Sequence, residues 1–119
     1  MKQRPPMLPP TRHHGEPAMQ PGDAAIRLTD TDAALARLSA VQKHYLTDSF
    51  VKFFVPRAHL QPPRPPLINI GTYLRSEAID ELVGQWIGRA ESEGKKCQVV
   101  SLGAGSDTRF WRLAVRIVI

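Results

Sequence analysis

Apolar residues recur at helical spacing in the first half of the chain. These positions are Leu35, Leu38, Val41 and Tyr45. The spacing predicts an amphipathic helix over about residues 31–46. Residues 29–32 read Thr-Asp-Thr-Asp and offer several N-cap candidates for it. Asp48 is expected to cap a short second helix over residues 49–55, which Pro56 ends.

A second amphipathic pattern follows Ser76, which is a candidate N-cap. Its apolar positions fall on one helical face and are Ile79, Leu82, Val83, Trp86 and Ile87. Residues 91–96 form a polar turn, and the apolar residues 97–102 then predict a buried strand. A helix, a turn and an apolar strand in this order indicate an α/β fold.

Prolines at positions 62, 63, 65 and 66 separate the two helical patterns. Because proline is excluded from helix interiors, the sequence predicts an extended path over residues 61–75. The apolar and nearly uncharged residues 67–74 lead to Arg75. A stiff apolar stretch that ends on one cation indicates a segment held against something else. The alternative is a plain connection with an exposed arginine.

A glycine-rich turn follows the predicted strand, and residues 103–109 read Gly-Ala-Gly-Ser-Asp-Thr-Arg. Glycine lets the backbone approach a ligand closely, and a helix N-terminus offers free N–H groups. Thr108 stands where the dinucleotide fingerprint needs a third glycine, and the Gly-Lys-Ser/Thr of a P-loop is absent, so both nucleotide sites are disfavoured. Two interpretations remain open. The turn binds S-adenosylmethionine as in methyltransferases, or it only connects strand and helix.

The chain has 119 residues and a formal net charge of +5, which is enough for one modest domain. Residues 1–22 are rich in proline and predict a disordered tail, so the domain is expected in residues 23–119. Basic and acidic residues are interspersed in that second range. Charge therefore does not indicate a nucleic-acid partner.

Several other classes of site are disfavoured. His13 and His14 lie in the tail without a cysteine or carboxylate cluster, so no metal site is expected. Cys97 is the single cysteine, cannot form an intramolecular disulfide and is expected in the core. No apolar run reaches the roughly 18 residues that span a bilayer, and prolines interrupt the place of a signal peptide. We expect a chain of the cytoplasm or nucleus with no membrane partner.

Three segments together resemble the leucine carboxyl methyltransferase family. They are RLSAV at 37–41 with Tyr45 and Asp48, RPPLINIGTYLR at 64–75, and QVVSLGAGSDTRFWRL at 98–113. The string PPLINIGTYLR resembles the branch, fungal in character, that methylates the C-terminal leucine carboxylate of the protein phosphatase 2A catalytic subunit. The alternative is the sister branch, which methylates a carboxylate on the wybutosine base of tRNA.

The resemblance implies the N-terminal part of a class I S-adenosyl-L-methionine-dependent methyltransferase, which has a Rossmann-like α/β fold. By position, Arg37 and Arg75 would hold the methionine carboxylate of this cofactor, since the planar fork of arginine matches a carboxylate. The turn Gly103-Ala104-Gly105 would pass under the cofactor. Asp107 would brace the loop by accepting backbone N–H bonds.

The resemblance also implies how the protein acts. Its partner would be the C-terminal tail of the phosphatase catalytic subunit. The protein would act as a monomer. No catalytic acid or base is expected, because a carboxylate at neutral pH is already a nucleophile. Tyr73 is expected to line the site or to pack, and Phe110 and Trp111 are expected in the core.

The chain departs from the family pattern after Leu113, where it reads AVRIVI. The resemblance implies later segments that bind the ribose, the adenine and the phosphatase tail, and we expect this product to lack them. We therefore expect a product truncated after the first strand and glycine-rich turn, mostly helical and marginally stable. Such a product is not expected to transfer methyl groups alone, and a non-enzymatic product is the third hypothesis.

Overall fold

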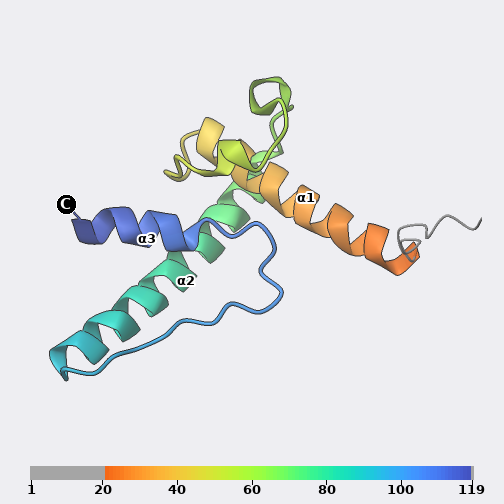
Figure 1. The fold of residues 1–119 in the computed structure, drawn as a ribbon. Helices are drawn as coiled ribbons and strands as arrows, with labels where there is room; N and C mark the ends of the chain where they lie inside the picture. Colours follow the sequence, from red (N-terminus) through yellow and green to blue (C-terminus); the bar gives the residue numbers. More distant parts are fainter. Residues whose placement is uncertain (1–20, 119) are drawn as a thin grey trace, which may run out of the picture.

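The computed structural model describes residues 21–118 (Figure 1). They form the α-helices α1 (Pro21–Gln42), α2 (Pro66–Ser92) and α3 (Arg109–Val118) and the single-turn 3-10 helices η1 (Val51–Phe53) and η2 (Ala58–Leu60). Figure 1 shows α1 crossing the first half of α2, with α3 beside the middle of α2. An irregular segment returns from the far end of α2 to α3. The helices therefore meet around the first half of α2.

Helix α1 contains most of the helix predicted over residues 31–46, but it begins about ten residues earlier, at Pro21, and ends four residues earlier, at Gln42. Proline suits a first helical position because its missing N–H would have no partner there. The threonines expected at the N-cap lie inside the helix instead. Thr29 Oγ1 donates to the carbonyl of Ile26 at 2.6 Å, and Thr31 Oγ1 donates to that of Arg27 at 3.1 Å. These bonds satisfy both hydroxyls within the helix.

Asp48 caps the next turn as predicted, although that turn is the 3-10 helix η1 and not an α-helix. Its Oδ1 accepts the backbone N–H of Phe50 at 2.9 Å and that of Val51 at 3.2 Å. A small apolar core lies between α1 and this region. It consists of the buried residues Ala34, Leu38, Val51 and Val55, with Leu35, Val41 and Ala58 packed against them.

Helix α2 begins at Pro66, so the extended path predicted for residues 61–75 is wrong beyond residue 65. Three prolines precede the helix and the fourth is its first residue, where proline is tolerated. Ser76 is consequently an interior residue and not an N-cap. The buried stripe of α2 is mainly polar and contains Asn69, Ser76 and Asp80. The predicted apolar face is largely uncovered, with Leu82 66% and Trp86 59% exposed.

The predicted α/β architecture is not seen among residues 21–118, which contain no strand. Residues 97–102 are irregular and exposed, and Cys97 is exposed instead of buried. A strand needs a neighbouring strand to pair its backbone groups, and the described residues offer none. The expectation of a mostly helical chain is confirmed.

The tail predicted for residues 1–22 and the pair His13–His14 lie outside the described residues, except that Pro21 and Gly22 open α1. At the other end, residues 114–118 continue α3.

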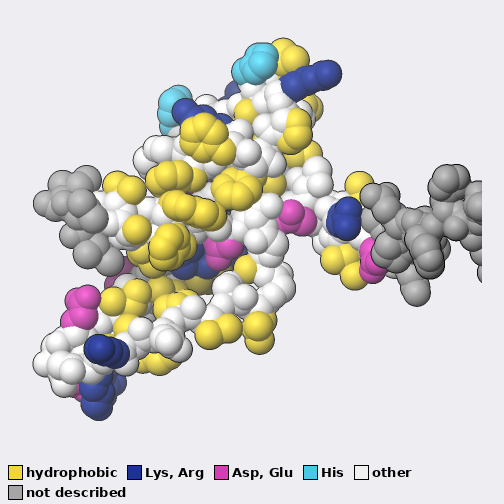
Figure 2. Space-filling view, viewed as in Figure 1, with side chains coloured by type: hydrophobic (Ala, Val, Ile, Leu, Met, Phe, Trp, Pro, Cys, Tyr) yellow, Lys and Arg dark blue, Asp and Glu magenta, His cyan; other side chains and the backbone are white. Residues whose placement is uncertain are grey.

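Aromatic side chains gather where α3 meets the η1 region. The Trp111 ring centroid lies 6.4 Å from that of Phe50 and 5.7 Å from that of Phe54. Core positions predicted for Phe110 and Trp111 are nevertheless wrong, since these side chains are 74% and 43% exposed. The apolar side chains visible over much of the face in Figure 2 agree with this incomplete coverage.

Candidate functional site

A pocket of about 560 Å³ lies between α1, α2 and the glycine-rich turn. Four of the six predicted cofactor residues line it, namely Arg37, Arg75, Ala104 and Asp107. Gly103 and Gly105 flank Ala104 in the same turn but are not among the lining residues. The pocket volume is within the range of about 300–1,000 Å³ that is usual for small-molecule sites. The fold thus gathers residues from three separate segments at one place.

Arg37 projects from α1 and is held on two sides. Its Nε donates to Asp48 Oδ2, and its Nη1 donates to Ser76 Oγ at 2.9 Å. Its Nη2 is buried and has no hydrogen-bond partner among the described residues. A buried guanidinium nitrogen without a partner loses its hydration without compensation. Arg37 therefore has one donor, Nη2, without a partner among the described residues.

Arg75 differs from Arg37 because its side chain is exposed on α2. Residues 21–118 provide no hydrogen bond or ion pair to its guanidinium. Both arginines line the same pocket, so a carboxylate there would meet one fixed and one adjustable cation. Tyr73 is exposed and does not line this pocket. It lines a smaller one of about 210 Å³, which also includes Arg37.

The glycine-rich turn needs glycine at two positions. Gly103 and Gly105 adopt φ values of 64° and 58°, a region that other residues rarely adopt. A Cβ at Gly103 would meet no protein atom within 4 Å, whereas one at Gly105 would lie 2.2 Å from Asp30 Oδ1. The turn thus packs closely against α1 at Gly105.

Asp107 braces the start of α3, as the resemblance implied. Its Oδ1 accepts the backbone N–H of Arg109 at 2.9 Å, and its Oδ2 accepts a bond from Arg109 Nη1 at 2.6 Å. The first bond satisfies one of the unpaired N–H groups at the helix N-terminus.

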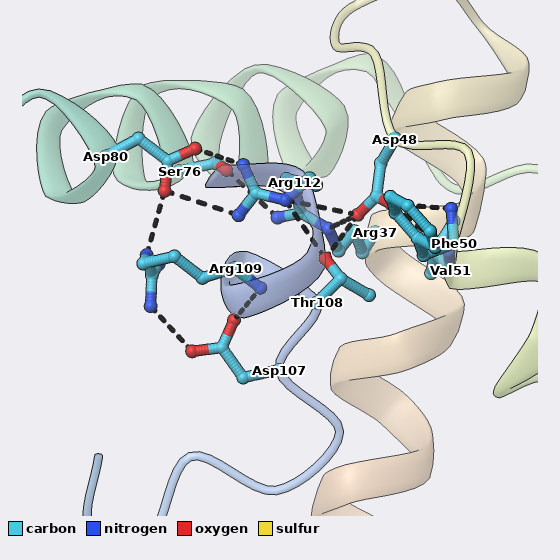
Figure 3. Close-up of polar contacts among 10 residues, drawn as sticks. All are labelled: Arg37, Asp48, Phe50, Val51, Ser76, Asp80, Asp107, Thr108, Arg109 and Arg112. Atoms are coloured by element: carbon cyan, nitrogen blue, oxygen red, sulfur yellow. Dashed lines mark hydrogen bonds and ion pairs between the residues drawn. The ribbon is translucent and has the colours of Figure 1, made fainter. Parts of the chain in front are cut away.

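Asp48 is the centre of a buried polar network (Figure 3). Its side chain is fully buried and accepts bonds from Arg37 and from Thr108 Oγ1, the latter at 2.5 Å. Arg112 Nε lies 3.6 Å from Asp48 Oδ2 and donates to Thr108 Oγ1 at 3.1 Å. This network joins α1, the η1 region and α3.

Asp80 is a second centre and ties α3 to α2. Figure 3 shows both arginines of α3 reaching it. Arg109 Nε donates to Asp80 Oδ1 at 2.8 Å, and Arg112 donates to both carboxylate oxygens, from Nη2 at 3.2 Å and from Nη1. Arg112 is buried, so its charge depends on these acceptors.

Both centres remain ionised because their partners outweigh the effect of burial. Burial raises the pKa of Asp48. Hydrogen bonds from Thr108, Arg37 and Phe50 lower it by more than burial raises it, so the pKa lies below its ordinary value. Burial likewise raises the pKa of Asp80, and the bonds from Arg112 and Arg109 lower it to below its ordinary value.

The sequence analysis missed three parts of this arrangement. Asp80 lies four residues after Ser76, near the start of the helix predicted there, where an acid is usual because of the helix dipole, so its ion pairs were not anticipated. Arg109 and Arg112 carried no signal, since their partner lies about 30 residues earlier. The third part is a contact of Asp30 with Ser106, which joins residues 76 positions apart. Only the geometry of the folded chain identifies these pairs.

Comparison with known proteins identifies the family. The sequence profile of the family "Leucine carboxyl methyltransferase" matches residues 25–116. The chain belongs to this family. The predicted family is therefore confirmed. The leucine carboxyl methyltransferase profile covers all residues that line the large pocket.

Individual relatives are fungal proteins named Leucine carboxyl methyltransferase 1. The chain is 50% identical over 121 residues to that of Cryptococcus neoformans var. neoformans serotype D (strain JEC21 / ATCC MYA-565), covering 92% of this chain and 32% of the relative. It is 47% identical to that of Emericella nidulans, covering 76% and 25%. It is 45% identical to that of Aspergillus fumigatus, covering 88% and 26%. The chain spans about a quarter to a third of these relatives, and no solved structure matches it significantly.

The arginines of the pocket are donors of the kind that a carboxylate group of a small ligand requires. The unpartnered Nη2 of Arg37 and the exposed Arg75 are donors suited to a carboxylate.

Among the described residues, no group of three or more His, Cys, Asp or Glu side chains could hold a metal ion. No helix within residues 21–118 has the length and apolarity to cross a membrane.

We predict that Asp80→Ala releases α3. The substitution leaves the buried charge of Arg112 without its carboxylate, which typically costs about 3–5 kcal/mol. Urea unfolding followed by circular dichroism should show a lower midpoint and reduced initial helicity. Glu81→Ala, on an exposed position of the same helix, is the control and should change stability by less than about 0.5 kcal/mol. Equal effects of both substitutions would contradict the role of Asp80.

We also predict that stability falls in acid. The lowered pKa values of Asp48 and Asp80 mean that the unfolded chain, with aspartates near pKa 4, binds protons first as pH falls. Their contribution is therefore complete above about pH 4 and is lost as pH falls through the folded-state pKa values. Urea midpoints measured between pH 7 and pH 3 should decline below about pH 4. A constant midpoint over this range would show that neither carboxylate is stabilised by its partners.

Proposed function

We propose that this chain provides the part of a leucine carboxyl methyltransferase that holds the carboxylate of S-adenosyl-L-methionine. The reaction would be methylation of the C-terminal leucine carboxylate of the protein phosphatase 2A catalytic subunit. The names of the relatives support a leucine carboxyl substrate. No feature of the described residues favours the tRNA base as substrate.

One observation carries this proposal. The pocket combines Arg37, Arg75 and the glycine-rich turn, although these segments are far apart in the sequence. Each arginine keeps donors without a protein partner, because Arg37 uses Nε and Nη1 for Asp48 and Ser76 but not Nη2, and Arg75 has no ion pair within residues 21–118. Two guanidinium groups beside a turn that permits close approach suit a ligand with a carboxylate and a flat adenine ring.

The residues of this chain would bind and orient, without transferring protons. When bound, the cofactor supplies a methyl group activated by its positively charged sulfur. Asp48 and Ser76 fix the orientation of Arg37, so its contribution to binding requires little loss of side-chain freedom. Arg75 adds a second donor from α2. Fixing the cofactor at this end lets the remaining site align the methyl group with the attacking carboxylate.

We further propose that residues 97–102 form the first parallel strand when other strands of a Rossmann-like sheet are present. Val99, Val100 and Leu102 are 52%, 76% and 90% exposed, which is unusual for three apolar residues within four positions. Strands of a parallel sheet are apolar because both faces are covered. The apolar composition of this segment supports its assignment as such a strand.

We predict that Arg75→Ala weakens binding of S-adenosyl-L-methionine to this chain by about tenfold or more, since bonds to charged groups contribute about 1.5–3 kcal/mol. Isothermal titration calorimetry would measure the dissociation constant. Arg27→Ala removes the same charge from an exposed position of α1 outside the pocket and should leave affinity unchanged. If both variants bind as the wild type does, Arg75 is not part of the site.

We predict that the chain can replace its counterpart in a relative. In a chimera, residues 25–116 of this chain would replace the matching segment of the Cryptococcus neoformans protein. The chimera should transfer tritiated methyl groups to the phosphatase catalytic subunit and to a peptide with a free C-terminal leucine carboxylate, but not to the amidated peptide. Arg75→Ala in the chimera should reduce transfer by about tenfold to a hundredfold. Transfer to the amidated peptide would contradict the assignment of the carboxylate as the methyl acceptor.

A further inference from the structure

Asp30 connects α1 to the glycine-rich turn. Its Oδ1 accepts the backbone N–H of Ser106 at 2.7 Å, and its Oδ2 accepts the Ser106 hydroxyl at 2.8 Å. Asp30 lies two helical turns before Arg37, on the same side of α1, and both residues line the large pocket. The Asp30 carboxylate thus accepts two hydrogen bonds from the turn at the edge of that pocket.

Little else holds this part of the chain. Between Cys97 and Ser106, the described residues form no hydrogen bond to the helices other than the two bonds to Asp30. A bond from the Asp107 N–H to the Gly105 carbonyl, at 2.9 Å, is local to the turn. The side chains of residues 97–105 are exposed, so packing contributes little to their position. Residues 107–109 are anchored separately, through Thr108 to Asp48 and Arg109 to Asp80, so the N-terminal part of the turn depends on Asp30 and on its connection to these residues.

The turn approaches Asp30 closely at Gly105. A Cβ at Gly105 would lie 2.2 Å from Asp30 Oδ1 and 2.9 Å from its Cγ. Only glycine allows this distance, and the positive φ of Gly105 also favours glycine. The contact sets the separation between α1 and the turn, and hence the width of the pocket between Arg37 and Ala104.

We infer that Asp30 is a positioning residue, which holds the glycine-rich turn at the distance from Arg37 that the cofactor requires. The inference rests on the proposed function, because it assigns Asp30 a role in the same cofactor site. Asp30 acts through Ser106 and not by contact with the reacting atoms. A charged acceptor suits this role since its hydrogen bonds are roughly twice as strong as those of a neutral one.

The same contact favours the ionised form of Asp30. The backbone N–H of Ser106 lowers the pKa of Asp30 below its ordinary value, and the Ser106 hydroxyl adds to this effect. An ionised carboxylate is only an acceptor, which suits both bonds.

The experiment compares three variants of the full 119-residue chain. Asp30→Ala removes both bonds to Ser106, and Asp30→Asn retains an acceptor for the Ser106 N–H and a donor toward the hydroxyl. Asp32→Ala is the matched control, because Asp32 is an exposed acid of α1 that pairs with Arg64 and does not contact the turn. Amide hydrogen exchange reports the order of residues 97–106. Calorimetry reports the dissociation constant for S-adenosyl-L-methionine, and circular dichroism reports the helix content.

Asp30→Ala should accelerate exchange at the Ser106 amide and weaken cofactor binding by about tenfold, with unchanged helix content. Asp30→Asn should stay within about threefold of the wild-type affinity, and Asp32→Ala should match the wild type. The inference is overturned if Asp30→Ala binds the cofactor as tightly as the wild type does, whether or not exchange accelerates. It is also overturned if Asp30→Asn is as weak as Asp30→Ala.

The same measurements separate this inference from the proposed function. If the wild-type chain binds no S-adenosyl-L-methionine, the cofactor site of this chain is refuted and the inference fails with it. If the wild type binds and Arg75→Ala weakens binding while Asp30→Ala does not, only the role of Asp30 is refuted.

Discussion

The buried carboxylates of Asp48 and Asp80 each depend on arginines that come from other elements. Among the residues whose burial the structure describes, seven buried ones are polar or charged and seven are apolar, and three of the apolar ones are alanines. The apolar core is therefore small, and ion pairs connect most of the elements. An unpaired buried charge costs several kcal/mol, so each partner favours one arrangement of the other. The network thus gives the chain specificity that its apolar contacts alone do not provide.

The geometry of the pocket follows from this network. Asp48 holds Arg37 by Nε, and Ser76 holds it by Nη1, which leaves Nη2 as the donor without a partner. Asp80 keeps α3 against α2, so the glycine-rich turn that leads into α3 lies near α1. Arg37 and the turn are therefore positioned by residues of the polar interior, whereas Arg75 is not. A stable fold and an oriented site have the same physical origin here.

The sequence predicted the parts of this structure that depend on local chemistry. The helix containing Leu38, the cap by Asp48 and the proximity of Arg37 to Arg75 at one pocket follow from spacing, capping preference and family motifs. It did not predict that residues 67–75 are helical, because the prolines before them obscured the fact that Pro66 can be a first helical residue. The expected strand needs neighbours that residues 21–118 do not contain. The ion pairs of Asp80 join distant positions for which periodicity carries no signal.

The continuity of α2 has a consequence for how the sequence can vary. Asn69, Ser76 and Asp80 contact, in turn, Ser39 with the Arg64 backbone, Arg37, and the arginines of α3. They lie on one rigid helix, in which each residue adds about 100° of rotation and 1.5 Å of rise. The helix therefore fixes the spacing and the relative direction of these three contacts. Substitutions on its exposed faces leave this spacing unchanged, whereas an insertion or deletion between the three residues changes it. Evolution of this helix is constrained more in length than in composition.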